Sequence, residues 1–506
     1  MRRGRFLKDM GAVGTSLYLT RFLYLIRGVI TARFLGPAAY GIWGALGILL
    51  SYSNLTPLGS AEAVGREIPY HAQRGDTERV RKTKRLAFSF NLYASLLGTL
   101  GVAIFALVRR AHLEPIYFHG LLVVAAGIPL QQLYFFYGIV LRAEKRFFFR
   151  SKVEVVYALF NVPVTVALVV LLGLYGLFAA FLVNLVGIVS YLTVRVPIRP
   201  QIRIPGAPLA ELMRIGFPIY LIGLVYTVFT SVDRLVILKY LSSSDMGYYT
   251  IAVTLMTILG EAPMVIAQVM SPNLIERYSG SESLDEVFPY VQIPTLSIAF
   301  FFPVLLVIAI FAFEYLVQYV LPRFLPGFAA LELLVFGSFF TGVLRGPSSF
   351  LLAVRKQTAA VIIYAIGVVI AVILNITFVK AGMGLAGVAL ATGLTYFLLL
   401  LMYASYVYSF FIGRRLGGYL ALYANVLLPF LLSLGVYLAL RRALPLTGDA
   451  AAADAGRVLL KAAIYLLLVS PTLFYFLRRH GLWRDLVDRV PWRAIRARLP
   501  FWPGEG

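Results

Sequence analysis

The sequence predicts an all-α membrane protein of about 14 transmembrane helices, arranged as two parallel six-helix lobes around a central cavity, with two further helices at the C-terminal end. Three observations lead to this fold class. Hydrophobic residues make up 60% of the 506-residue chain, and its mean hydropathy is +0.84. Apolar runs of about 18 or more residues, each long enough to cross the hydrocarbon core as a helix, recur from Gly11 to Leu477. The first half of these runs also resembles the second.

The apolar runs between polar, glycine and proline residues give the individual helices. The first six are predicted near residues 11–34, 38–60, 86–108, 117–141, 153–173 and 176–194. The next six lie near 212–240, 246–270, 288–312, 328–352, 359–379 and 384–410, and the last two near 418–440 and 457–477. We therefore predict an N-terminal lobe (1–195), a cytoplasmic linker (196–211), a C-terminal lobe (212–410), two extra helices (411–477) and a basic amphipathic cytoplasmic tail (478–506).

The distribution of positive charge predicts the orientation. With the N-terminus in the cytoplasm, the predicted cytoplasmic segments hold 32 of the 46 Lys and Arg residues, against 8 in the outer loops. Such an excess is typical of cytoplasmic loops, so we predict a multi-pass protein of the cell membrane with both termini in the cytoplasm. The net charge of +23 accompanies no nucleic-acid-binding motif, so we expect membrane lipid and no nucleic acid as a partner. In the tail, arginines alternate with Trp483, Trp492 and Trp502, which suits the headgroup region.

The two halves are related by a shift of 206 residues. The segment ITARFLGPAAYGIW (30–43) then lies on VILKYLSSSDMGYY (236–249), which pairs Arg33 with Lys239 and Gly41 with Gly247. Later segments match with small gaps: LRAEK (141–145) on LAVRK (352–356), and YGLFAAFL (175–182) on MGLAGVAL (383–390). Because the copies begin six helices apart, both begin on the same side of the membrane. The sequence therefore predicts parallel repeats, whose two lobes enclose a cavity that opens to either side as they rock.

Polar and charged side chains recur inside the first helix of each predicted lobe. In the first helix, Ser16, Thr20, Tyr24, Arg27 and Thr31 stay within roughly 80° of one helical face. In the seventh helix the stripe covers roughly 120° and comprises Tyr226, Thr227, Thr230, Asp233 and Arg234. A charge at mid-bilayer costs about 2.5–3.5 kcal/mol and normally faces protein or water. We therefore predict that the two stripes line one hydrophilic cavity.

Arginine in such a cavity favours an anionic cargo, because its planar guanidinium binds pairs of phosphate or carboxylate oxygens and keeps its charge when partly dehydrated. We predict that the arginines inside the helices bind a diphosphate. Arg21 points away from the stripe, and its alternative role is a contact with another helix. Arg33 and Lys239 lie near the predicted outer ends of their helices, where we expect them to reach lipid headgroups. The predicted binding residues are Arg27, Arg21, Arg234, Arg345, Thr20, Tyr24, Tyr226 and Thr230.

Asp233 and Glu261 are the acids that the sequence places well inside predicted helices. They either balance the charge of the arginines or bind a coupling proton or Na⁺, and a purely structural ion pair is the alternative. The chain has no cysteine, and its 4 histidines have no ligand spacing, so we expect neither a metal site nor a cofactor. The sequence has no acidic pair with metal-ligand spacing at an aqueous helix end and no glycine loop that would hold a phosphate, so we predict a carrier rather than an enzyme. It also has no Walker-type loop, so we do not expect ATP-driven transport by this chain alone.

Several of these segments resemble a known family. ARFLGPAAYGIW (32–43), with LGSAEAVGREIPYH (58–71) after it, resembles the start of the polysaccharide-biosynthesis or O-antigen-type flippases. These belong to the multidrug/oligosaccharidyl-lipid/polysaccharide (MOP) exporter superfamily. VDRLVILKYLSSSDMGYYTIA (232–252) resembles the seventh-helix segment of the same group. The resemblance covers most of the chain and identifies the superfamily better than the substrate.

The resemblance implies a flippase that moves an isoprenoid-diphosphate-linked oligosaccharide from the cytoplasmic to the outer leaflet by alternating access, for polysaccharide or glycan biosynthesis. In such flippases, cavity arginines bind the diphosphate while the lipid tail stays in the bilayer. Arg27 and Arg234 match the basic positions expected there. Glycosyltransferases or a polymerase are possible partners.

Three other functions stay open. A cation-coupled multidrug exporter of the same superfamily would use Asp233 or Glu261, but an arginine-rich first helix would repel organic cations. Lipid II flippases commonly carry an acid directly after an arginine in the first helix, whereas Arg21 and Arg27 are followed by Phe22 and Gly28. A major-facilitator carrier also has parallel six-helix repeats, but its glycine-acidic-basic signature between helices 2 and 3 is missing.

Overall fold

The computed structural model describes residues 3–281, 284–354, 356–413, 415–448 and 450–479, and these residues form helices and loops without a strand. Beyond residue 479, the predicted amphipathic tail lies outside the described residues. The chain forms two compact units that alternate along the sequence. Unit 1 comprises Met1–Ile258, Val320–Gly337 and Gln357–Leu399, and unit 2 comprises Leu259–Tyr319, Ser338–Lys356 and Leu400–Gly506. The predicted lobe boundaries stay a prediction.

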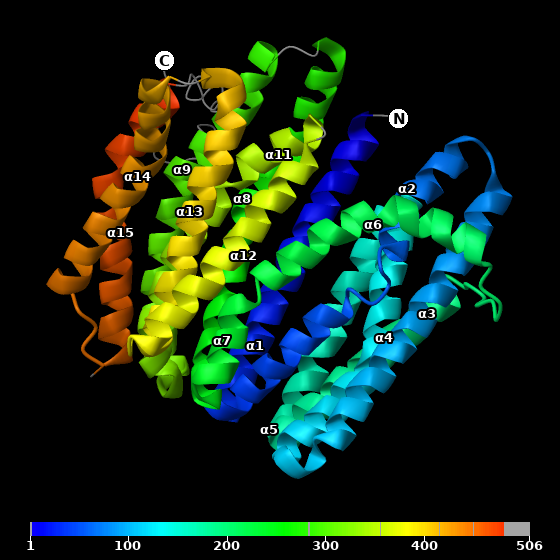
Figure 1. The fold of residues 1–506 in the computed structure, drawn as a ribbon. Coiled ribbons are helices and arrows are strands. Elements are labelled where there is room, and N and C mark those ends of the chain that lie inside the picture. Colours follow the sequence, from blue (N-terminus) through cyan, green and yellow to red (C-terminus); the bar gives the residue numbers. More distant parts are fainter. Residues whose placement is uncertain (1–2, 282–283, 355, 414, 449, 480–506) are drawn as a thin grey trace, which may run out of the picture. The chain divides into compact units, whose positions relative to one another are not determined.

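The helices follow one another with short connections (Figure 1). The first half contains α1 (Arg3–Ser53), α2 (Ser60–Gln73), α3 (Thr77–Val108), the short η1 (Arg110–His112), α4 (Pro115–Ala143), α5 (Phe147–Arg195), α6 (Gly206–Phe229) and α7 (Val232–Tyr240). The second half contains α8 (Ser243–Ser281), α9 (Leu284–Tyr315), η2 (Leu316–Val320), η3 (Pro322–Gly327), α10 (Phe328–Val343), α11 (Arg345–Ala353), α12 (Gln357–Lys380), α13 (Gly384–Ile412), α14 (Leu416–Ala443) and α15 (Ala451–Arg479).

The described residues contain 12 helical segments long and apolar enough to cross a membrane. Two of these segments contain a break at a glycine with positive φ: Gly36 in α1 (φ 74°) and Gly173 in α5 (φ 59°). Only glycine adopts such a backbone without strain, which explains why each break falls there. Counting both sides of the two breaks gives 12 + 2 = 14 helices, and the predicted all-α membrane fold is confirmed.

A helix occupies part of the polar gap that the sequence placed between its second and third spans. Helix α2 carries Glu62, Arg66 and Glu67 together with a buried apolar side that includes Val64 and Ile68. This amphipathic pattern is too polar for a span but suits a helix packed on others at the membrane boundary. Helix α3 begins directly afterwards, where Asp76 accepts a hydrogen bond from the backbone N–H of Arg79 (2.9 Å).

Unit 1 is built around the long helices α1, α3, α4 and α5, which lie side by side in Figure 1. Its core includes Phe136, Tyr137 and Val140 of α4, and the Phe136 ring packs edge-on against Phe88 of α3 at 5.6 Å. The α1–α5 contact is extensive. It brings the polar stripe of the first helix against the middle of α5.

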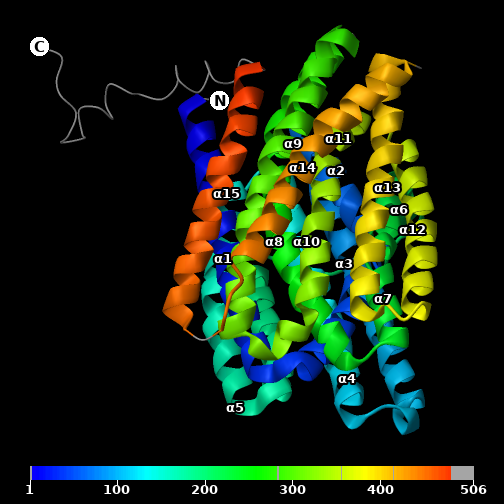
Figure 2. The ribbon, with the colours of Figure 1, turned by 90° about the vertical axis from the view of Figure 1, so that its left-hand side faces the viewer.

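Unit 2 packs α14 and α15 against α9, as Figure 2 shows. Stacked rings join these helices and α10: Phe339 lies 4.3 Å from Phe430, and Phe300 lies 4.3 Å from Phe476, between ring centroids. Aromatic pairs of this kind add about 0.5–1.5 kcal/mol to the burial of their area. The two C-terminal helices are therefore an integral part of this unit.

Two glycines related by the sequence repeat meet where α1 crosses α8 inside unit 1. A Cβ atom added to Gly41 would overlap the carbonyl oxygen of Ser243, and one added to Gly247 would overlap the carbonyl oxygen of Pro37. The two clashes are equivalent, because Pro37 and Ser243 are themselves 206 residues apart. The helices touch backbone to backbone at this point, and the contact has the two-fold character expected of parallel repeats.

Candidate functional site

Arg27 of α1 lies against α5 and is held there by neutral groups. Its Nη1 donates a hydrogen bond to Oδ1 of Asn161 (2.6 Å), and its guanidinium carbon lies 5.1 Å from the centre of the Tyr24 ring. No carboxylate of the described chain forms an ion pair with it. The guanidinium therefore keeps both its charge and unused N–H donors.

A cavity of about 280 Å³ opens beside Arg27. Helices α1, α4 and α5 form its walls, which carry amides, hydroxyls and aromatic rings but no acid. Such a lining offers hydrogen-bond donors to an anion without competing with it for the arginine. Its polar residues other than Arg27 are Gln131, Tyr134, Tyr157, Asn161, Thr165 and Asn184.

A second cavity of about 270 Å³ shares Tyr134 and Phe135 with the first, so the two adjoin. Thr20, Arg21 and Tyr24 of α1 line it, so four of the predicted binding residues, Arg27 included, border the two spaces. Its other charged residues come from the end of α4 and the start of α5: Arg142, Arg150 and Glu154. We call the two spaces together the basic cavity.

One arginine of the basic cavity forms an ion pair with an acid of the same lining. Arg150 binds Glu154 one turn further along α5, with Nη2 at 2.8 Å and Nε at 2.9 Å from the same carboxylate oxygen. Arg21, Arg27 and Arg142 line the same walls. An excess of guanidinium groups over carboxylates is what recognition of a multiply charged phosphate needs.

Several residues of the basic cavity were missed by the sequence interpretation. Arg142 and Arg150 were assigned to a cytoplasmic loop, and Asn161 and Asn184 were given no role. Asn161 does carry a signal, because an amide two residues before Pro163 interrupts an otherwise apolar run. Ser16, which the sequence placed on the same stripe, has a side chain outside the described part of the structure.

The seventh predicted span is broken rather than continuous. Helix α6 ends at Phe229 and α7 begins at Val232. The hydroxyl groups of Thr230 and Ser231 donate back to the carbonyls of Tyr226 (3.0 Å) and Val228 (3.0 Å), which competes with further helix formation. The single 120° stripe expected over Tyr226 to Arg234 is therefore wrong, because it assumed one helical period across the break.

Asp233 lies in a closed hydrogen-bonded cluster beyond that break. Its Oδ2 accepts a hydrogen bond from the Tyr249 hydroxyl (2.6 Å), and its Oδ1 accepts one from the backbone N–H of Arg234 (2.7 Å). The Arg234 guanidinium donates to the carbonyl of Thr230 (2.8 Å). Asp233 is buried, and Tyr249 also lies 3.3 Å from Thr392 of α13. The carboxylate is thus well satisfied by its own neighbours.

The remaining predicted residues lie apart from the basic cavity or in the other unit. Tyr226 is 45% exposed and packs edge-on against Tyr364 at 5.9 Å. Glu261 and Arg345 are half-buried members of unit 2, in α8 and at the start of α11. A site shared by these two residues and Arg27 stays a prediction.

A buried ion pair in unit 2 was not anticipated. Lys461 of α15 has no exposed side-chain surface, and its Nζ donates to Oε2 of Glu314 in α9 at 3.0 Å. About two helical turns before Lys461, Asp454 accepts hydrogen bonds from the hydroxyl of Tyr319 (2.7 Å) and from the guanidinium of Arg457 (2.6 Å). Lys461 was given no role from the sequence. Its partner lies 147 residues away, so no local pattern indicates the pair.

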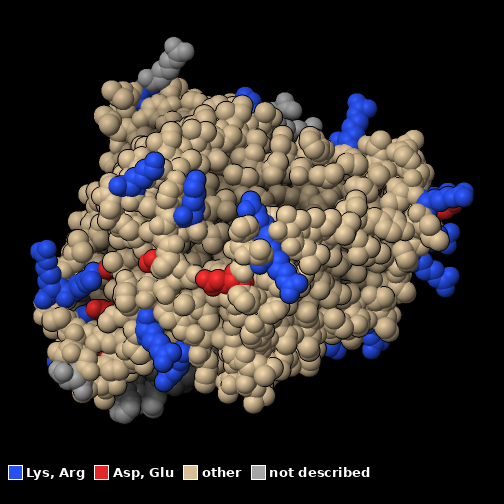
Figure 3. Space-filling view, turned by 60° about the horizontal axis from the view of Figure 1, so that its bottom comes forward, with Lys and Arg blue, Asp and Glu red and all other residues tan. Residues whose placement is uncertain are grey.

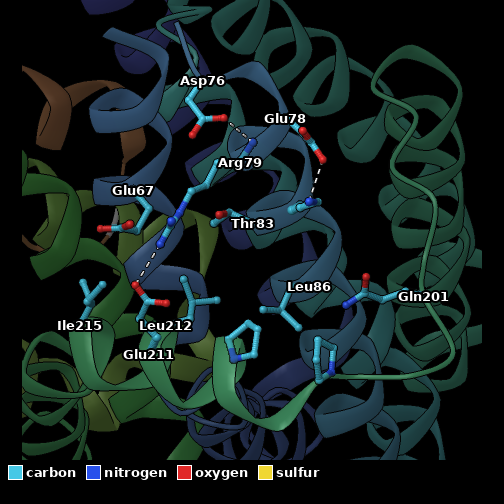
Figure 4. Close-up of a pocket in the computed structure, with 13 residues that line it drawn as sticks. Glu67, Asp76, Glu78, Arg79, Thr83, Leu86, Gln201, Glu211, Leu212 and Ile215 are labelled. Atoms are coloured by element: carbon cyan, nitrogen blue, oxygen red, sulfur yellow. Dashed lines mark hydrogen bonds and ion pairs between the residues drawn. The ribbon is translucent and has the colours of Figure 1, made fainter. Parts of the chain in front are cut away.

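A cavity of about 570 Å³ lies between α2, α3 and α6 in unit 1 (Figure 4). Both of its basic groups pair with acids, Arg79 with Glu211 at 3.1 Å and Lys82 with Glu78 at 2.7 Å, and its lining also contains Glu67 and Asp76. A lining with more acids than bases offers less to an anion than the basic cavity does. Across the described residues, no cluster of three or more His, Cys, Asp or Glu side chains fits a metal ion.

Comparisons with known proteins identify the family. The sequence profile of the family described as "Polysaccharide biosynthesis protein" matches residues 30–323, more than half of the chain. No curated protein sequence matches the chain significantly.

Solved structures of transporters share the fold. "Lipid II flippase MurJ, inward closed conformation" is similar with a TM-score of 0.70 and 17% identity, over 94% of this chain and 99% of that one. The inward-facing and outward-facing conformations of a MATE-family multidrug resistance transporter give TM-scores of 0.62 and 0.55, at 16% and 15% identity. These cover 78% and 79% of this chain and 96% and 94% of theirs. The chain therefore belongs to the polysaccharide biosynthesis protein family, as a multi-pass membrane protein with the fold of these transporters.

Proposed function

We propose that the protein is a flippase that transfers an isoprenoid-diphosphate-linked oligosaccharide from the cytoplasmic to the outer leaflet by alternating access. The observation that carries this proposal is the environment of Arg27, a charged side chain inside a membrane span that donates its hydrogen bond to a neutral amide and lies beside an open cavity without acids. A charge held this way inside a membrane protein is costly unless a ligand neutralises it. The family assignment indicates that the ligand belongs to polysaccharide biosynthesis.

A diphosphate suits the basic cavity. Guanidinium groups bind phosphate oxygens in pairs, and Arg21, Arg27 and Arg142 line adjoining walls. Aromatic rings of Tyr24, Tyr134 and Tyr157 would contact the first sugar, because apolar faces of sugars pack on rings. The oligosaccharide itself needs no charged contact, so the same cavity accepts the head group without specifying the whole glycan.

The membrane potential is a sufficient drive in this proposal. A diphosphate carries about two negative charges, and an inside-negative potential of 100 mV assists their outward movement by about 4–5 kcal/mol at ~2.3 kcal/mol per charge. Coupling to a proton or Na⁺ is optional, and Asp233 and Glu261 are its candidate residues. We further propose location in the cell membrane with both termini in the cytoplasm, transport rather than catalysis, and glycosyltransferases or a polymerase as partners.

The test is leaflet transfer in proteoliposomes. A short-chain isoprenoid-diphosphate sugar is supplied inside, and an external glycosidase reports its appearance outside. Wild type is compared with Arg27→Ala, with and without an imposed potential. We expect Arg27→Ala to slow transfer at least about tenfold, since one charge-assisted hydrogen bond contributes about 1.5–3 kcal/mol.

Arg79→Ala is the matched control, because this arginine lines a different cavity and is already paired with Glu211, so its loss is expected to leave transfer unchanged. Transfer no faster than in protein-free vesicles, for several sugars and isoprenoids, would overturn the proposal. Resistance of expressing cells to cationic dyes would then favour a multidrug exporter.

A further inference from the structure

A cavity of about 330 Å³ lies beside the break of α1 at Gly36, and two arginines line it. Arg33 comes from the last turn before the break and Arg323 from η3. Both side chains are exposed, and within the described chain neither forms an ion pair with an acid. The other lining residues are apolar: Phe34, Val320, Leu321, Pro322 and Phe324. We call this space the η3 cavity.

Arg323 projects from a firmly held base. The Phe324 ring is buried and packs edge-on against Tyr40 at 6.2 Å and Tyr248 at 5.9 Å. A Cβ atom added to Gly327 would overlap the Cβ of Tyr248, so η3 also touches α8 closely. The position of Arg323 is therefore set by packing on both sides, and the entropy cost of ordering it against a ligand is reduced.

The Arg323 guanidinium lies over the break in α1. A Cβ atom added to Gly36 would lie 3.6 Å from its Nη1. Arg33 is three residues before Gly36 in the same helix. Two positive charges from separate elements thus line one small space, and like charges repel unless an anion lies between them.

A general tendency of arginine to reach lipid headgroups explains Arg33 but not the pair. The predicted outer loops hold only 8 of the 46 Lys and Arg residues, so a second arginine from another element is against the trend there. Figure 3 brings the lower end of Figure 1 forward and shows Lys and Arg standing mostly singly on an uncharged surface. Exposed apolar side chains flank the arginines: Phe34 is 54% and Leu325 is 51% exposed.

We propose that the η3 cavity binds the phosphate-containing headgroup of a membrane lipid, with both guanidinium groups paired to phosphate oxygens and the start of the lipid chain against Phe34 and Leu325. The apolar walls select a lipid over a free phosphate. Two sources share this chemistry. One is an anionic phospholipid of the bilayer, and the other is the isoprenoid diphosphate after its transfer, an assignment that rests on the proposed function.

Binding is measured with a fluorophore next to η3. The chain has no cysteine, so Ala329→Cys, at an exposed position in the first turn of α10, gives a single attachment site for an environment-sensitive dye. The labelled full chain in neutral detergent is titrated with dihexanoyl phosphatidylglycerol, with farnesyl diphosphate and with dihexanoyl phosphatidylcholine. We expect a saturable response to at least one of the first two probes.

The arginines are then removed singly and together. Arg33→Ala and Arg323→Ala are each expected to weaken binding about tenfold and the double variant about a hundredfold, since every 1.4 kcal/mol is tenfold. Arg110→Ala is the matched control, because it removes an exposed arginine of η1 whose guanidinium lies over Phe118 at 5.4 Å. A melting curve of each variant checks that it is folded, and a double variant that melts early is replaced by Arg33→Gln with Arg323→Gln.

The probes identify the source of the lipid. A response to phosphatidylglycerol supports the headgroup site and assigns it to bilayer lipid, whereas a response to farnesyl diphosphate alone supports the site and assigns it to the transported lipid. Arg79→Ala, which changes neither the basic cavity nor the η3 cavity, should leave both responses unchanged. The dye reports binding without leaflet transfer, so binding here survives even if transfer fails in the flippase test. An equal response in the double variant, or an equal response to phosphatidylcholine, would overturn the proposal.

Discussion

Arg27 of unit 1 and Lys461 of unit 2 both carry a positive charge inside apolar helices, but their neighbours differ. Lys461 is completely buried, and its Nζ lies 3.0 Å from the Glu314 carboxylate. Arg27 is half-buried, donates to the neutral Asn161 and borders a cavity of about 280 Å³. The charge of Lys461 is neutralised inside the protein, whereas the charge of Arg27 is available to an anionic ligand in the cavity.

The difference separates a structural charge from a binding one. A buried ion pair is intact only while both partners are present, and losing either strands the other in a low-dielectric surrounding. A charge satisfied by neutral dipoles beside open space is already partly hydrated, so its removal costs the fold little. Stability and transport should therefore respond oppositely to substitutions at the two places.

The largest expected effect comes from Glu314→Ala. It leaves Lys461 buried without its carboxylate, which should lower the free energy of unfolding by about 3–5 kcal/mol. Unfolding in mixed micelles with increasing dodecyl sulfate measures this. The double variant Glu314→Leu with Lys461→Met removes both charges and is expected to recover most of the loss. Equal destabilisation in single and double variants would show that packing, not charge, holds α15 on α9.

Tyr249→Phe tests an intermediate case, a buried acid with several partners. The change removes the hydroxyl that donates to Asp233 at 2.6 Å but keeps the backbone N–H of Arg234 as a donor. We expect a loss of about 1–3 kcal/mol in the free energy of unfolding. Tyr248→Phe makes the same chemical change one residue earlier. If that control costs as much, the effect cannot be assigned to the Asp233 hydrogen bond.

Glu62 sharpens the comparison, because one oxygen of this acid is buried without a hydrogen-bond partner. Its Oε2 is buried without a hydrogen bond, and burial raises the pKa of the carboxyl above its ordinary value of 4.5. The folded state therefore binds this proton more tightly than the unfolded state does, and the resulting stabilisation is lost as pH rises through the folded pKa. Glu62→Gln should remove this decline and add about 1 kcal/mol near pH 8. Melting curves from pH 4 to pH 8 report it, and parallel curves for both proteins would contradict the expectation.

The smallest expected change in stability is that of Arg27→Gln. Glutamine can still bond to Asn161, and the open cavity hydrates the shortened side chain, so the free energy of unfolding should change by less than about 1 kcal/mol. Leaflet transfer should nevertheless fall, as for Arg27→Ala. For Glu314→Ala, by contrast, the free energy of unfolding should fall strongly. A loss of stability at Arg27 as large as at Glu314 would end the distinction between the two charges.

The helices could be predicted because a membrane span is recognised from its length and apolar composition. The α1 stripe was partly predictable as well, since Thr20, Tyr24 and Arg27 share a helical period, and all three border the basic cavity. The break between α6 and α7 was not, because Thr230 and Ser231 end a helix only through hydrogen bonds back to its carbonyls.

Other features depended on contacts between distant residues. Lys461 and Glu314 are 147 residues apart, and no periodicity links them. Arg142 and Arg150 read as loop charges because the sequence could not show that the ends of α4 and α5 turn toward α1. Periodicity identifies which face of a helix is polar, whereas what that face meets follows from tertiary packing.

The crossing of Gly41 and Gly247 has a genetic consequence. A side chain introduced at either position would overlap a main-chain carbonyl oxygen. No substitution at another position can remove that main-chain atom. Loss of one glycine therefore has no suppressor among neighbouring side chains. In a collection of related sequences, we expect a small residue at each of the two positions independently, so the two positions would not covary. This backbone-to-backbone contact between the two repeats is thus one that covariation, the usual sequence signal of proximity, would leave unmarked.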